Sequence, residues 1–213
     1  MAEPFKFYEC IAMVKMTGRR AADIMELLEI LKTISPESIF HHMHQYFLKS
    51  HIVSPEYPND FAVWVSSELG DNSLAEGLAN LNPYDYEDIE DVRGELLRII
   101  VEHLRNCPPP SPVLPGKEFF FNEAVTIVIP TGLEANDVGE FAKMLKEVDR
   151  SSIYFHFYEA RLRLAKKKDD FSSFLEDCLA CHPAAAGIKS LDPYMYSTEV
   201  LREKIVGLLE GAA

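Results

Sequence analysis

The stretch Phe119-Phe-Phe-Asn-Glu-Ala-Val-Thr-Ile-Val-Ile-Pro-Thr-Gly132 is aromatic or β-branched at most positions. It aligns without a gap with Phe5-Lys-Phe-Tyr-Glu-Cys-Ile-Ala-Met-Val-Lys-Met-Thr-Gly18, at a constant shift of 114 residues. The composition of the later stretch is typical of a β-strand, and Thr-Gly is typical of the turn that ends one. The earlier stretch has weaker strand character and is also compatible with a helix, so its prediction as a strand depends on its twin.

The alignment extends well beyond these two stretches. Residues 5–44 and 119–158 are identical at 14 of 40 positions, and nine further identities link residues 60–86 with residues 170–196 at a shift of 110. Self-similarity of this kind indicates an internal duplication. We therefore expect a first repeat at residues 1–106, a proline-rich linker at 107–117, and a second, diverged repeat at 118–213.

The remaining pattern is mainly helical. Residues 21–34, with apolar positions at helical spacing, predict the first helix of each repeat, and Ser35-Pro36-Glu37 predicts the start of the next. Each repeat thus contains one short strand and four to five helices, which gives a fold that is mainly α with a minor β component (α+β). A lone strand leaves backbone groups unpaired, so we expect the two strands to pair antiparallel around a pseudo-twofold axis.

Charge and composition restrict the classes of partner. The chain has 213 residues, 47% of them hydrophobic, and a net charge of −13 from 21 basic and 34 acidic residues. This charge disfavours nucleic acids and anionic lipid surfaces. The sequence has neither an apolar run of membrane-spanning length nor a signal peptide, so we expect a cytoplasmic protein whose four cysteines are reduced.

A histidine cluster, Phe40-His41-His42-Met43-His44 followed by His51, is the motif most suggestive of a metal. Imidazole is a common ligand of divalent transition metals, which makes His42, His44 and His51 the candidate ligands. The second repeat reads Phe155-His156-Phe157-Tyr158 and keeps only the counterpart of His42. Ordinary half-buried helix histidines, with no cofactor, are therefore the favoured interpretation.

The polar residues kept in both repeats include Glu9, His42 and Asp60. Glu9 falls on the apolar face of the predicted strand, where a carboxylate must be hydrogen-bonded or neutralised. The structural interpretation is a buried Glu9 to His42 hydrogen bond, with Asp60 at the start of a helix. The catalytic interpretation makes the same three residues an acid–base site, and both remain open.

Cysteine spacing and the single tryptophan give weaker signals. Cys178-Leu-Ala-Cys181-His182 has the letters of a c-type haem attachment motif, but a haem site is disfavoured without an export signal. A redox-active pair of Cys178 and Cys181 remains open. Trp64 aligns with Phe174 on a predicted helix, so we expect Trp64 to be mostly buried.

The first 105 residues resemble a family of uncharacterised prokaryotic proteins known only as a domain of unknown function. The resemblance rests on Thr17-Gly18, on Ser38-Ile39-Phe40, on His42-Met43-His44, and on Pro58-Asn59-Asp60-Phe61-Ala62. It implies no activity. The second half is similar to a diverged copy, in which Tyr158 stands at the position of His44.

These observations favour a non-catalytic interaction or regulatory module that binds a protein partner or a small ligand in the groove between the halves. The alternative is a metal-dependent or acid–base enzyme that uses the histidine cluster of the first repeat. Homo-oligomerisation is compatible with either function. The sequence leaves open whether the protein is an enzyme.

Overall fold

A computed structural model describes residues 3–44, 57–160, 168–192 and 195–211. The protein is mainly helical with a two-stranded antiparallel sheet, which confirms the predicted class and the antiparallel pairing. Within the described part of the chain, every helix is too short or too polar to cross a membrane.

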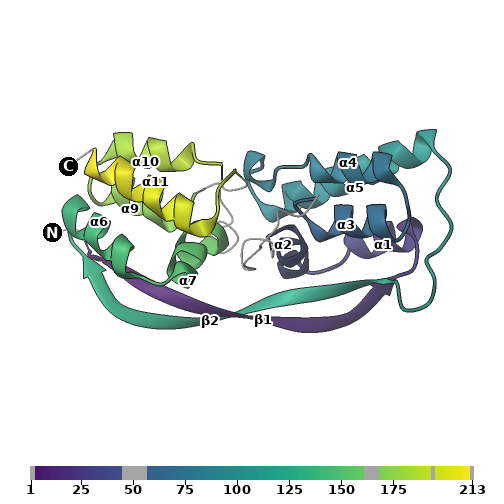
Figure 1. Cartoon of the computed structure of the whole chain (residues 1–213), viewed down its shortest axis with the longest axis horizontal. Helices are drawn as coiled ribbons and strands as arrows, with labels where there is room; N and C mark the ends of the chain where they lie inside the picture. Colours follow the sequence, from purple (N-terminus) through teal and green to yellow (C-terminus); the bar gives the residue numbers. More distant parts are fainter. Residues whose placement is uncertain (1–2, 45–56, 161–167, 193–194, 212–213) are drawn as a thin grey trace. The chain divides into compact units, whose positions relative to one another are not determined.

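Two long strands, β1 (Phe5–Ala21) and β2 (Phe119–Ala135), run side by side (Figure 1). Each has 17 residues, so the prediction of a short strand ended by a Thr-Gly turn is wrong. Gly18 and Gly132 lie inside the strands at φ +77° and +76°, a conformation that glycine adopts most easily. Thr-Gly is therefore a local irregularity within each strand.

The chain divides into two compact units. Residues 13–125 form one, the continuous unit, while residues 1–12 and 126–213 together form the other, the split unit. Each unit therefore combines the helices of one half of the sequence with segments of both strands. The compact units therefore do not coincide with the sequence repeats. Residues 1–12 open the first repeat but belong to the split unit, and residues 118–125 open the second repeat but belong to the continuous unit.

The continuous unit is built mainly from helices. They are α1 (Ile24–Leu31), α2 (Pro36–His44), α3 (Asp60–Ser67), α4 (Asn72–Ala79), the 3₁₀ turn η2 (Pro83–Asp85) and α5 (Ile89–Asn106). Asp and Asn side chains cap the N-termini of most of them, at positions 23, 59, 71, 82 and 88. Phe119 and Phe121 of β2 complete the apolar core of this unit.

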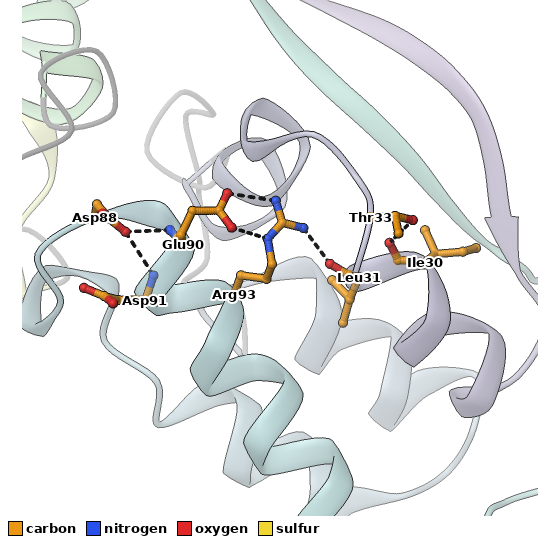
Figure 2. A network of polar contacts seen from close by, with 7 residues as sticks. All are labelled: Ile30, Leu31, Thr33, Asp88, Glu90, Asp91 and Arg93. Carbon is orange, nitrogen blue, oxygen red and sulfur yellow. Dashed lines mark hydrogen bonds and ion pairs between the residues drawn. The ribbon is translucent and has the colours of Figure 1, made fainter.

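An arginine ties the last helix of this unit to the first. Arg93 of α5 donates to the main-chain carbonyl of Leu31 at the end of α1 over 2.6 Å, while Glu90 holds the same guanidinium (Figure 2). Asp88 caps α5 beside it. In the split unit, Arg202 likewise donates to the carbonyl of Val148.

The split unit has a similar succession of helices. They are α6 (Val138–Glu147), α7 (Arg150–Ile153), the π-helical η3 (Tyr154–Glu159), α9 (Asp170–Asp177), α10 (His182–Lys189) and α11 (Thr198–Glu210). Phe5 and Phe7 of β1 pack on Phe141 of α6, with ring centroids 5.0 and 5.4 Å away. Asp169 caps α9, and Asp170 is the first residue of this helix.

The proline-rich segment 107–117 runs without helix or regular strand, as its composition predicts. It lies within the continuous unit, where the Val113 N–H donates to the Ala22 carbonyl over 2.8 Å. The segment is thus held by the part of the continuous unit that precedes it in the sequence.

Candidate functional site

His42 holds the edge of strand β2 through both of its ring nitrogens. Its Nε2 accepts the backbone N–H of Asn122 at 2.9 Å, and its Nδ1 lies 2.8 Å from Asp60 Oδ2. A backbone N–H can only donate, so Nε2 carries the lone pair and the Nδ1–H donates to Asp60. His42 is 3% exposed, among the rings of Phe61 and Phe119. The buried imidazole is neutral in this arrangement.

The split unit repeats this arrangement with different residues. His156 Nε2 accepts the backbone N–H of Tyr8 at 2.9 Å, and its Nδ1 donates to Asp170 Oδ2 at 2.7 Å. Tyr8 and Asn122 occupy aligned strand positions, so each histidine binds the strand that belongs to the other half of the sequence. We call this Asp–His–strand arrangement the histidine pin.

Glu9 takes no part in the pin, and the predicted Glu9 to His42 hydrogen bond is wrong. Glu9 belongs to the split unit and His42 to the continuous unit. The strand does not alternate as assumed, because Tyr8 and Glu9 are both half-buried and Cys10 is buried. The candidate Glu9, His42 and Asp60 site therefore contributes one pair, His42 with Asp60, and the sequence signal for it was their joint retention in both halves.

Glu123, which aligns with Glu9, has cationic and hydroxyl partners. Lys15 Nζ lies 3.0 Å from one carboxylate oxygen, and the Ser35 hydroxyl donates to the other over 2.8 Å. These two contacts lower the pKa of Glu123. The residues aligned with Lys15 and Ser35 are Ile129 and Asp149, so Glu9 cannot reproduce this carboxylate site.

The split unit instead has a buried thiol beside acidic groups. Cys10 is 7% exposed and its Sγ contacts the Ser151 carbonyl at 3.5 Å. Burial raises the pKa of Cys10 to about 12, with further contributions from Glu159, Asp149 and Glu9. A thiol with so high a pKa is unreactive at neutral pH.

His44, another predicted metal ligand, does not join His42 in a cluster of ligand atoms among the described residues. The Nδ1–H of His44 donates to the Phe40 carbonyl over 3.1 Å, and its ring stacks on Phe40 at 4.3 Å. His51 lies outside the described residues. His42 and His44 are two residues apart on α2, which places them on different faces of the helix.

His41 is the residue that the sequence reasoning missed. His41, His42 and Asp60 offer ligand atoms that all lie within 4.8 Å of one another, close enough to hold a metal ion after small movements. A metal on Nδ1 of His42 would move the ring proton to Nε2, which faces the Asn122 N–H. Metal binding would therefore break the pin. The position aligned with His41 is Phe155, so the split unit lacks the third ligand.

A cleft of about 770 Å³ opens in the split unit beside its histidine pin. Aromatic residues of β1, η3 and α9 line it, with Asp170 and His156 among them. Charged residues of both signs, including Lys6 and Asp177, and the exposed thiol of Cys178 also border it. Its volume lies within the range of sites that hold small organic ligands.

Comparison with known proteins places the chain in a family. The sequence profile of a family of unknown function (DUF5752) matches residues 2–210. The chain belongs to this family. The resemblance seen in the first 105 residues is thereby confirmed, and the family match extends through the second half as well.

A solved structure, that of OrfY from Thermoproteus tenax, is 31% identical to this chain with a TM-score of 0.87. The alignment covers 99% of this chain and 95% of OrfY. No curated protein matches. The description of the family and that of OrfY name no activity, so the functional argument depends on the geometry above.

Proposed function

We propose that this protein is a non-catalytic binding or regulatory module. One observation carries the proposal: both ring nitrogens of His42, and both of His156, are committed to the pin. A general base needs a lone pair directed at a substrate proton, and here that lone pair receives a strand N–H. The pin therefore accounts for the retention of histidine and aspartate without any chemistry.

The matched contacts also support an origin by internal duplication. Thr17 and Thr131 donate to the carbonyls of Phe121 and Phe7 over 2.6 and 2.7 Å, in addition to the two pins. The pseudo-twofold relation remains a prediction. A prokaryotic, cytoplasmic setting is supported by the Thermoproteus relative and by four free cysteines.

Unfolding measurements test the pin. His42→Ala and His156→Ala should each lower the free energy of unfolding by roughly 1 to 3 kcal/mol, because each removes a buried imidazole that bonds a part-buried Asp and a strand N–H. Exposed His182→Ala serves as the control and should change stability by less than about 0.5 kcal/mol. A His42→Ala protein as stable as the parent would contradict the proposal and favour a functional role for this residue.

The second candidate function is a metal-dependent enzyme, favoured by the proximity of His41, His42 and Asp60. Zinc titration of protein purified without chelator separates the two. The binding-module proposal predicts no zinc site that depends on His41. One equivalent of bound zinc that is lost in His41→Phe, the residue found at the aligned position 155, would establish the metal site instead.

A further inference from the structure

In the continuous unit, the chain just before strand β2 is fastened to helix α3. The indole N–H of Trp64 donates to the main-chain carbonyl of Lys117 over 2.8 Å. The Lys117 ammonium lies 3.3 Å from Glu68 at the end of the same helix. Trp64 is 6% exposed, as expected from the sequence, and its ring meets Phe119 edge-on at 5.7 Å. An aromatic N–H thus closes this end of the unit.

In the split unit, the aligned residues cannot make this closure. Phe174 stands for Trp64, Cys178 for Glu68 and Glu3 for Lys117, which removes the N–H donor, the carboxylate and the ammonium. Among the described residues, no hydrogen bond reaches the Glu3 carbonyl. Phe174 still packs on Phe5, at 5.2 Å. The aromatic contact is kept and the polar closure is lost.

The cleft of about 770 Å³ lies where the closure is lost. Glu3, Phe5, Phe174 and Cys178 all line it, and Tyr8 and Phe155 extend its aromatic wall. The exchange of Trp for Phe removes only part of an indole, so the cleft is much larger than this exchange alone would leave and has room for a whole additional ring. The missing group is therefore a flat aromatic ring with an N–H, in a site that already has aromatic walls and a carbonyl acceptor.

We propose that this cleft binds a small planar aromatic ligand that carries a ring N–H, of which indole is the simplest example. The ring packs against Phe5 and Phe174, and the N–H donates to the Glu3 carbonyl, as Trp64 donates to Lys117 in the continuous unit. The assignment rests on the proposed binding function and names the class of ligand that the split unit takes.

The test uses the thiol at the edge of the cleft as a reporter. In the full chain with Cys107→Ser and Cys181→Ser, the exposed Cys178 is the reactive thiol, since Cys10 is buried with a pKa of about 12. Indole should slow the modification of Cys178 by a maleimide saturably. Binding of 1-methylindole, which has the same ring without the donor, should be roughly two- to tenfold weaker.

Matched variants locate the ligand. Phe174→Trp supplies the missing indole from within the chain and should abolish the protection of Cys178 by indole. Trp64→Phe, the reverse exchange in the continuous unit, should leave it unchanged. Equal binding of indole and 1-methylindole, no protection by indole, or full protection in Phe174→Trp would each overturn the ligand assignment. None of these outcomes touches the unfolding test of the pins, so the two proposals fail separately.

Discussion

The continuous and split units have the same histidine pin but differ in what surrounds it. At one, Glu123 is held by Lys15 and Ser35, and Trp64 closes the start of the strand. At the other, the aligned positions have lost the lysine, the serine and the tryptophan, and a cleft is open. The comparison teaches that the pin is common to both units, whereas the contacts around it differ. Function is best sought where the two units differ.

The largest expected effect tests which strand completes which unit. Phe7→Ala and Phe121→Ala should each cost about 3 to 5 kcal/mol, because each removes a ring that is 1% exposed. Hydrogen exchange should show that Phe7→Ala loosens helices of the split unit, and Phe121→Ala those of the continuous unit. Loosening of α1 to α5 by Phe7→Ala would break the comparison, because it would mean that each strand serves its own half of the sequence.

A smaller effect tests the irregularity in both strands. Gly18→Ala and Gly132→Ala should each destabilise by about 1 to 2 kcal/mol, because φ near +77° is strained for a residue with a Cβ. Gly94→Ala and Gly207→Ala are the matched helix controls, with open space around the added methyl group, and should stabilise by about 0.5 to 1 kcal/mol. Chemical denaturation measures all four. A neutral Gly18→Ala would show that the strand can straighten.

The smallest effect concerns the two aligned glutamates. Glu123→Gln should lose about 0.2 to 1 kcal/mol at neutral pH through the half-exposed contact with Lys15, and Glu9→Gln should lose nothing comparable. The folded pKa of Glu123 is lowered, so its contribution is present above the unfolded pKa and disappears as the pH falls through the folded pKa. The unfolding free energies of the parent and Glu123→Gln should therefore differ at neutral pH and become equal at acidic pH. An equal loss in Glu9→Gln would remove the distinction between the units.

Much of the local structure follows from the sequence. Residues 119–129 form a strand because β-branched and aromatic residues fit an extended backbone, and the strand at residues 5–15 follows from its alignment with them. Asp or Asn before an apolar helical pattern marks most helix starts. The retention of His42 and Asp60 in both repeats drew attention to these residues, although the sequence paired His42 with Glu9 and placed Asp60 only at a helix start. The burial of Trp64 followed from its alignment with Phe174.

Only the tertiary structure decided the hydrogen-bond partners of the two histidines and the unit in which each strand segment packs. The hydrogen bonds from Asn122 to His42 and from Tyr8 to His156 use backbone N–H groups, which every residue but proline has, so no side-chain pattern could reveal them. The sequence also does not reveal which unit each strand segment joins. Residues 5–7 and 119–121 are similarly aromatic, so either segment could pack on either set of helices. Sequence determines which segments extend or coil, through local backbone preferences. The choice of surface for each segment depends on long-range packing, and that choice placed a pin in both units and an open cleft in the split unit.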